Sequence, residues 1–152
     1  MSTYNGRDAR VTVNADTTEK IVTEIGSWNI DTSADEIDTT AFGDGWGKSD
    51  VGMKKWSGSL SGFSDPADTT GQDVLYQAFL SGSLIGDIRF YLEYSETSGA
   101  DIKYIEPDTV SDANAGLRVT SWNVTQDKAN VASLSMNFSG SGPLRIVQTT
   151  VT

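Results

Sequence analysis

The sequence predicts a mainly β protein, a β-sandwich or flattened barrel of two packed sheets with one α-helix on its flank. Three observations carry this prediction. Much of the chain alternates polar and apolar residues with a period of two, which is typical of half-buried strands. Residues 27–30 (SWNI) return almost unchanged as residues 121–124 (SWNV). Each phrase opens an alternating run, and a second run that ends in glycine follows each one, so a single strand-pair plan occurs twice.

Composition narrows the function classes. The 152 residues fit one domain with a sizeable core, and we expect a single domain over 1–152 with residues 1–8 as a loose leader. Cysteine and histidine are both absent, which excludes disulfides, thiolate nucleophiles, Ser-His-Asp triads and nearly all zinc or iron sites. No apolar run approaches the roughly 20 residues that a bilayer requires, and residues 1–8 lack the apolar core of a secretory signal. We therefore expect no membrane role.

The charge balance leaves two interpretations open. Acidic residues outnumber basic ones by 21 to 11, and the formal net charge is −10. Such a surface repels DNA and has no patch that neutralises phosphates. The acidity either confers solubility or lets nucleic acid pass without being held.

The first strands follow from alternation and from glycine. Residues 9–14 alternate and predict a short strand. Residues 20–25 and 27–32 predict further strand, with a bulge or bend at Gly26 between them. Residues 37–42 continue the β pattern.

A long protruding loop is predicted over about 43–55. Residues 43–52 break all periodicity and are rich in glycine, and the alternating strand 56–63 follows. An extended arm of this length, at about 3.3 Å per residue, reaches roughly 30 Å. The loop carries Trp46, for which the sequence offers no intramolecular partner. Partner binding explains this tryptophan, and the alternative is that the loop folds back and buries the ring.

One helix is predicted over about 70–81. Residues 65–70 combine a turn with helix N-cap chemistry, and Gly82 is placed to end the helix. Its apolar residues fall on one face: Val74, Leu75, Ala78 and Phe79.

The remaining runs predict strands at 83–94, 102–105, 117–126 and 131–140. The tail over 144–152 alternates weakly and forms either a last strand or an arm donated to a neighbour.

Candidate catalytic groups are few. Glu36 and Asp38 share a strand face, so a glycosidase-like acid pair is conceivable, and Asp65 and Asp68 offer a second pair. A solvated acidic face and a helix cap are the favoured interpretations of these carboxylates. The glycines at 43–47 match neither a phosphate-binding loop nor a calcium loop, so we expect no cofactor and no metal.

The three tryptophans inside alternating runs are interpreted as sheet-packing residues: Trp28, Trp56 and Trp122. A carbohydrate-binding stripe of aromatic side chains is the alternative for this set.

Several motifs follow one another in order: residues 27–30, 37–43 (IDTTAFG), 52–62 (GMKKWSGSLSG), the helix with Leu75, Ala78, Leu80 and Gly82, 119–122 (VTSW) and 138–144 (FSGSGPL). In this order they resemble the major tail tube protein family of long-tailed bacteriophages. The resemblance covers roughly residues 25–146, and the order of the motifs carries it rather than any single one.

The resemblance implies a fold of two sheets with a flanking helix, whose subunits join sheet edges into hexameric rings. In the family the inner sheets form a barrel around a channel, and the rings stack into a tube around the tape measure protein, through which DNA passes without specific binding. The resemblance also implies contacts with tail terminator and distal tail proteins, a place in the virion and synthesis in the bacterial host cytoplasm. An extra immunoglobulin-like domain, which many relatives carry, is not expected here.

The long loop of the family reaches a neighbouring subunit or ring, and residues 43–55 occupy its place. We expect a subunit interface that includes Phe42, Trp46, Lys48, Met53, Lys54 and Lys55, and a net negative channel wall. The tube of an injection device is a related alternative. A carbohydrate-binding or adhesive β-sandwich is a second, and a carboxylate-dependent hydrolase has the least support.

Overall fold

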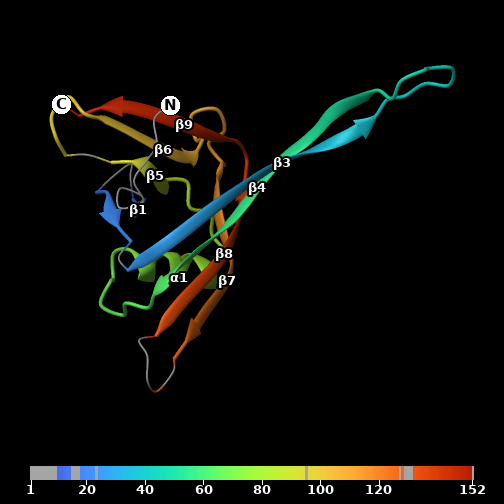
Figure 1. Cartoon of the computed structure of the whole chain (residues 1–152). Coiled ribbons are helices and arrows are strands. Elements are labelled where there is room, and N and C mark those ends of the chain that lie inside the picture. The colour runs from blue at the N-terminus through green and yellow to red at the C-terminus, as the bar shows by residue number, and fades with distance from the viewer. Residues whose placement is uncertain are drawn as a thin grey trace.

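Two antiparallel sheets pack face to face with a helix beside them (Figure 1). The computed structural model describes residues 10–14, 18–22, 24–94, 96–126, 128 and 132–151, so the predicted leader over 1–8 lies outside them. Within the described residues the sheets form a sandwich and no closed barrel. The elements are β1 (Arg10–Val13), β2 (Lys20–Ile21), β3 (Ile25–Asp38), β4 (Ser49–Phe63), α1 (Gln72–Ser81), β5 (Arg89–Glu93), β6 (Asp101–Pro107), β7 (Gly116–Thr125), β8 (Ser133–Ser141) and β9 (Leu144–Thr150).

The strand order separates the two layers. One sheet has five strands in the order β2-β1-β5-β6-β9, and the other has four in the order β3-β4-β8-β7. The four-stranded sheet consists of two hairpins, β3/β4 and β7/β8, which pair through β4 and β8. Strands β3 and β7 are therefore its two edges. The tail of the chain forms β9, which pairs with β6 at an edge of the five-stranded sheet.

The repeated tryptophan phrase has a structural counterpart in the four-stranded sheet. Trp28 pairs with Leu60, Leu60 pairs with Met136, and Met136 pairs with Trp122. These four residues form one row across the sheet, with a tryptophan at each edge. Leu60 and Met136 are fully buried, and both tryptophans pack against the core. The strand-pair plan inferred from the sequence is thus one hairpin used twice.

The core joins the sheets through aromatic contacts. Phe90 on β5 is fully buried, and its ring centroid lies 5.3 Å from that of Trp28 and 5.5 Å from that of Phe138. Trp56 packs edge-on against Phe138. Burying one such side chain contributes about 1.5–3 kcal/mol, so this cluster supplies much of the cohesion between the layers.

The helix begins and ends where the sequence predicts. Asp68 accepts hydrogen bonds from the backbone N–H groups of Gly71 and Gln72, both at 3.0 Å, and so satisfies N–H groups at the start of α1. Leu75 faces the core and is fully buried. Gly82 ends the helix with φ of 70°, a left-handed conformation that favours glycine.

The predicted loop over 43–55 is too long, and so is the strand predicted to continue through Phe42. Strand β3 ends at Asp38 and β4 begins at Ser49, so the true loop covers only residues 39–48. Asp38 pairs with Ser49, and the pairing continues from there to the body of the sheet. The first residues of β4, from Ser49 onward, lack the alternation of polar and apolar residues that is typical of a strand. They form strand because β3 supplies hydrogen-bond partners for their backbone groups. The bulge predicted at Gly26 is confirmed by the register shift beside it.

The strand predicted at 83–94 is shorter than expected and covers only β5. Ile85 instead bridges Leu117 on β7, which belongs to the other sheet. The chain therefore crosses between the two layers over residues 86–88, and one continuous strand cannot serve both sheets. The strands predicted at 9–14, 102–105, 117–126 and 131–140 match β1, β6, β7 and β8 to within a few residues.

Gly140 offers a test of the core geometry. A Cβ atom built on Gly140 would lie 1.8 Å from the Trp56 ring, whereas one on Gly45 meets nothing within 4 Å. We expect Gly140→Ala to lower the free energy of unfolding by about 2–3 kcal/mol, because overpacking displaces the indole. The matched control, Gly45→Ala, should change it by less than about 0.5 kcal/mol. Denaturant titration of the unassembled protein measures both, and equal stabilities would show that Trp56 does not occupy this place.

Candidate assembly surface

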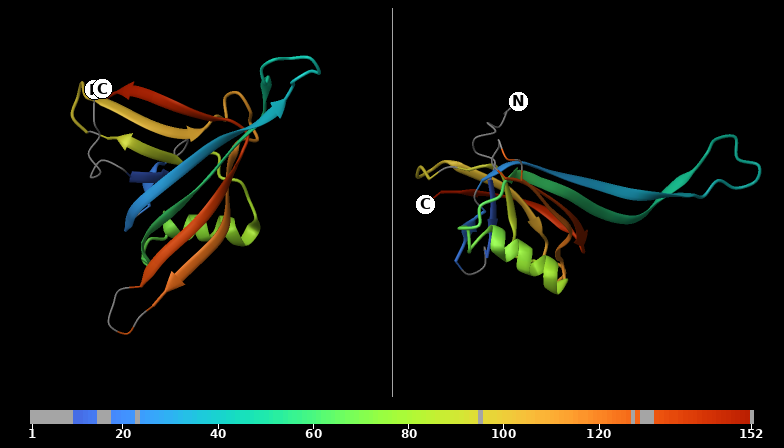
Figure 2. Two further views of the ribbon diagram at one scale, coloured as in Figure 1. Left: turned by 45° about the vertical axis from the view of Figure 1, so that its right-hand side comes forward. Right: turned by 90° about the horizontal axis from the view of Figure 1, so that it is seen from below.

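A two-stranded arm projects from the body of the sandwich (Figure 2). The pairing of β4 with β8 begins at Ser57, and among the described strands residues 49–56 of β4 pair with β3 alone. We call residues 32–56 the arm. Its two strands run out from the sheet and meet in the loop 39–48.

The tip of the arm is shaped by its own polar contacts. The Thr39 backbone N–H donates to the carbonyl of Lys48 at 3.0 Å. The Ala41 N–H donates to an Asp44 carboxylate oxygen at 2.7 Å, and the Lys48 ammonium contacts Asp44 at 3.3 Å. The loop therefore has a defined shape that does not require burial of its aromatic rings.

Those rings face solvent. Phe42 is fully exposed and Trp46 is 88% exposed, so the alternative in which the loop folds back and buries Trp46 is wrong in this structure. Large apolar side chains that cluster on an exposed projection are typical of a binding site.

All six residues predicted for the subunit interface lie on the arm: Phe42, Trp46, Lys48, Met53, Lys54 and Lys55. The structure brings them onto one projection but not into one cluster, since Phe42, Trp46 and Lys48 belong to the tip and the others to β4. Their role in an interface stays a prediction. Sequence reasoning missed Ile37 and Val51, which are more than half exposed on the arm. Their apolar character was visible in the sequence, but their exposure depends on the arm leaving the core.

The two carboxylate pairs considered above lie in separate places, on the arm and before α1. Glu36 and Asp38 line a hollow of about 420 Å³ on the arm, together with Thr40, Lys48 and neighbouring residues. Hydrogen bonds from Thr40 lower the pKa of Asp38, so this group is a poor proton donor. Asp68 is occupied with the start of α1.

A larger groove lies at the root of the arm. Its volume is about 620 Å³, and it is lined by residues 32–34, 54–56 and 142–144. The Trp56 indole N–H donates to the Gly142 carbonyl at 2.9 Å and so closes one end of the groove with a fixed contact. The lining contains lysines but no carboxylate, hence no acid pair for hydrolysis.

The outward face of the four-stranded sheet is neutral and polar. We call it the hydroxyl face. Register places its side chains in three rows: Ser27, Ser61, Ser135 and Asn123; Asn29, Ser59, Asn137 and Ser121; Asp31, Ser57, Ser139 and Arg118. Ser59 donates to the Asn29 side chain at 2.6 Å, and the Asn137 amide donates to Ser121 at 2.9 Å. The only charged members, Asp31 and Arg118, lie on the two edge strands.

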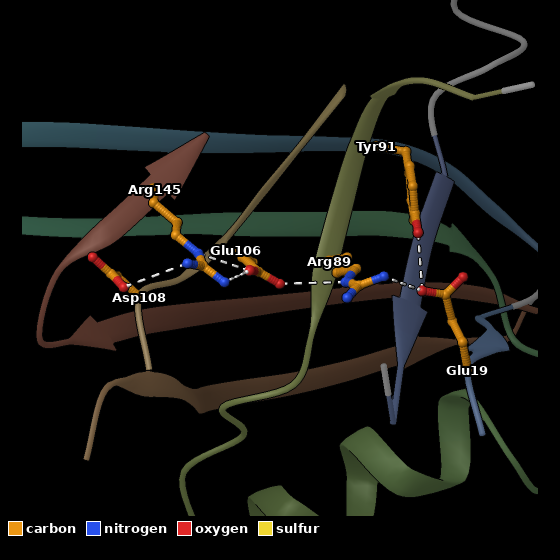
Figure 3. Close-up of polar contacts among 6 residues, drawn as sticks. All are labelled: Glu19, Arg89, Tyr91, Glu106, Asp108 and Arg145. Carbon is orange, nitrogen blue, oxygen red and sulfur yellow. Dashed lines mark hydrogen bonds and ion pairs between the residues drawn. The ribbon is translucent and has the colours of Figure 1, made fainter. Parts of the chain in front are cut away.

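The outward face of the five-stranded sheet carries charged side chains instead, and these form ion pairs and hydrogen bonds with one another (Figure 3). Glu106 on β6 is buried and accepts hydrogen bonds from Arg89 at 3.3 Å and from Arg145 at 2.8 Å. Glu19 contacts Arg89 at 3.0 Å and accepts a hydrogen bond from the Tyr91 hydroxyl at 2.9 Å. The network joins β5, β6 and β9 across the sheet. Because its buried carboxylate is paired with two arginines, we interpret the network as a structural tie.

The described residues contain no group of histidine, cysteine, aspartate or glutamate side chains arranged to hold a metal ion. None of their helices has the length and apolar character needed to span a bilayer. Trp28, Trp56 and Trp122 face the core rather than solvent, so they do not form the carbohydrate-binding stripe considered above.

Chains of several solved structures have the same arrangement of sheets and helix. The chain is similar to one from the tail of an empty gene transfer agent particle determined with C6 symmetry, with a TM-score of 0.71 at 16% identity over 94% of this chain and 98% of that one. It is also similar to a chain of an extracellular contractile injection system sheath–tube complex (TM-score 0.59, 15% identity, 97% of this chain and 92% of that one). The chain shares the fold of these tail and sheath–tube chains. A chain of the cap that terminates the anti-feeding prophage tube shares this fold as well (TM-score 0.62, 16% identity, 99% of this chain and 93% of that one).

The likeness to these chains is one of structure, at sequence identities of 15–16%. No family model and no curated protein matches the sequence. The matched chains come from particle tails, tubes and a tube cap, and the matches span nearly the whole of this chain. The fold prediction of two sheets with a flanking helix is confirmed.

Tyr91 gives the network a testable pH dependence. Burial raises the pKa of Tyr91 to about 12, and its hydrogen bond to Glu19 acts in the same direction. Since the ordinary tyrosine pKa is about 10, the folded state holds this proton more tightly than the unfolded state does. The contribution to stability is therefore complete below pH ~10 and is lost as the pH rises through the folded-state value. We expect Tyr91→Phe to reduce the loss of stability between about pH 10 and 12, measured by denaturant titration. Tyr76→Phe, on an exposed part of α1, is the control and should behave as the wild type.

Proposed function

We propose that this protein is the structural subunit of a tail tube, which assembles with copies of itself into stacked rings around a channel for DNA. The observation that carries the proposal is the pair of free edges on the four-stranded sheet. Within the described residues, strand β3 has 14 residues and pairs only with β4, and β7 has 10 residues and pairs mainly with β8. Long unpaired edges expose rows of backbone N–H and C=O groups and are prone to pair with other chains.

The directions of these edges favour a ring. All neighbouring strands in the sheet are antiparallel, so β3 and β7 run in opposite directions. When a second copy is related to the first by rotation, its β3 lies antiparallel to the β7 of the first copy. The antiparallel sheet can therefore continue from β7 of one copy to β3 of the next, and the repeated rotation closes it into a ring. Hexameric rings follow from the resemblance and agree with the C6 symmetry of one matched tail.

In such a ring the hydroxyl face lines the channel, because the opposite face of the sheet is buried against the rest of the sandwich. This proposal changes our expectation about charge. The rows of the hydroxyl face hold one aspartate and one arginine, so the wall is neutral and the net negative charge of the chain lies elsewhere. Serine and asparagine side chains hold water without offering a cation to phosphate, and a polyanion passes without being retained.

The arm extends the proposal from ring to tube. Its exposed Phe42 and Trp46 supply apolar contacts to a neighbouring ring, and the polar contacts within the loop hold the tip in one shape before binding. The tape measure protein within the channel and the terminator and distal proteins at the tube ends are the further partners. The protein then belongs to the virion and is made in the bacterial host cytoplasm.

The tube of an injection device is the second candidate, because two of the matched structures belong to such devices. Both candidates require the same ring and the same arm. The glycan-binding alternative loses support because the three tryptophans of the sheets are not on an exposed surface.

The arm provides the test of the function. We expect the double variant Phe42→Ser/Trp46→Ser to remain folded and to form no tubes, because the contacts between rings are lost while the sandwich is untouched. Negative-stain electron microscopy and sedimentation over a concentration series measure assembly, and thermal unfolding of the unassembled protein measures folding. Val110→Ser removes an exposed apolar side chain outside the arm and is the matched control.

Two results would contradict the proposal. Wild-type protein that stays monomeric at high concentration would remove its basis. Tubes of normal length from the double variant would show that the arm tip is not the contact between rings.

A further inference from the structure

The two edge strands of the four-stranded sheet carry charge of opposite sign. Within the described residues the edge of β3 is free, and the edge of β7 is free beyond Leu117, which bridges Ile85. The charged residues of β3 are all acidic: Asp31, Asp35, Glu36 and Asp38. The only charged residue of β7 is Arg118. An acidic margin and a basic margin therefore lie at opposite sides of one sheet.

Asp31 and Arg118 are too far apart to form an ion pair with each other within one copy. Asp31 pairs in register with Ser57, Ser57 with Ser139, and Ser139 with Arg118, so β4 and β8 separate the two charges. Asp31 forms no ion pair in the part of the chain that the structure describes. Arg118 is exposed, and among the described residues its guanidinium donates a hydrogen bond only to the neutral carbonyl of Gly82, at 3.4 Å.

Asp35 continues the acidic margin toward the arm. Its carboxylate lies 3.8 Å from the Lys55 ammonium, and both side chains are more than half exposed. An ion pair this long and this exposed contributes little, so Asp35 retains most of its capacity to bind a second cation.

We propose that Arg118 of each copy forms an ion pair with the acidic margin of β3, Asp31 and Asp35, in the next copy of this chain. The inference rests on the proposed ring. A sheet that closes into a barrel is staggered along its strands, so Arg118 lies opposite a position displaced from its own row. Asp31 and Asp35 are spaced along the strand, and an arginine also reaches diagonal neighbours on an adjacent strand. At least one of the two carboxylates is therefore within reach of Arg118 for more than one value of the stagger between copies.

The same arrangement selects the direction of assembly. Two β3 edges could also pair antiparallel with each other, which would give a closed dimer instead of a ring. In that dimer one acidic margin faces another, and like charges on adjacent strands repel. The opposite charges of β3 and β7 thus favour the head-to-tail contact and disfavour the head-to-head contact.

Charge reversal and charge exchange test this pairing. The variants are Arg118→Glu, the double variant Asp31→Lys/Asp35→Lys, and the triple variant that combines them. We expect each of the first two to raise the critical concentration for tube assembly by about tenfold at low salt, because each interface changes an attraction into a repulsion. The triple variant should return to within about threefold of the wild type, because the pair is restored with its charges exchanged. The differences should shrink at 0.5 M NaCl, where charges on the surface are screened.

Controls separate this contact from general effects of charge and from misfolding. Glu96→Lys makes the same change of charge as each aspartate substitution at an exposed site away from both edges and should leave assembly unchanged. Thermal unfolding of each unassembled variant verifies folding. Arg118→Gln removes the charge while keeping a long polar side chain, and it should weaken assembly less than Arg118→Glu.

The outcomes are distinct for the two proposals. If the wild type forms no tubes, the proposed function fails and this inference fails with it. If the wild type forms tubes but Arg118→Glu assembles equally well, Arg118 does not face an acidic margin. A triple variant no better than the worse of its parents also overturns the pairing, while the tube function stands.

Discussion

The architecture depends on the need of backbone N–H and C=O groups at a sheet edge for hydrogen-bond partners. Among the described residues, the four-stranded sheet meets this need internally for residues 57–63 of β4 and for β8, and leaves it unmet along one side of β3 and most of one side of β7. The two edges run in opposite directions because the sheet is built from two antiparallel hairpins. The same type of hairpin occurs twice, and each copy contains one of the two similar tryptophan segments of the sequence. Together the two hairpins contribute to the core and leave sheet edges with which another copy can pair.

The two faces of the sandwich divide the remaining tasks. The five-stranded sheet is tied by ion pairs around the buried Glu106, which fixes its outward face without a partner. The outward face of the four-stranded sheet carries short neutral side chains that bond across strands. Charge is therefore concentrated away from the surface that we assign to the channel, and several exposed large apolar side chains lie on the arm: Ile37, Phe42, Trp46, Val51 and Met53. In the proposed tube, assembly and passage would therefore use surfaces of different chemistry.

Sequence reasoning succeeds where the signal is local. Alternation locates most strands, the glycines at 26 and 82 mark a bulge and a helix end, and Asp68 lies within the predicted capping segment. It fails where a distant partner decides the outcome. Ser49 and its neighbours become strand because β3 lies beside them, Ile85 leaves its run to bridge Leu117, and Glu106 is buried by arginines from two other strands. The neutral hydroxyl face was also not anticipated, since total charge does not say which face bears it.

The arm has a consequence for how such a particle could change over time. In the described part of the chain its strands pair only with each other beyond the sheet, so in the proposed tube the spacing that they would set between rings is independent of the sandwich. Inserting two residues in each strand would extend the arm by about 7 Å and keep every side chain on its present side. In the proposed tube, the distance between successive rings could then change in steps of that size while the circumference of the channel stays constant.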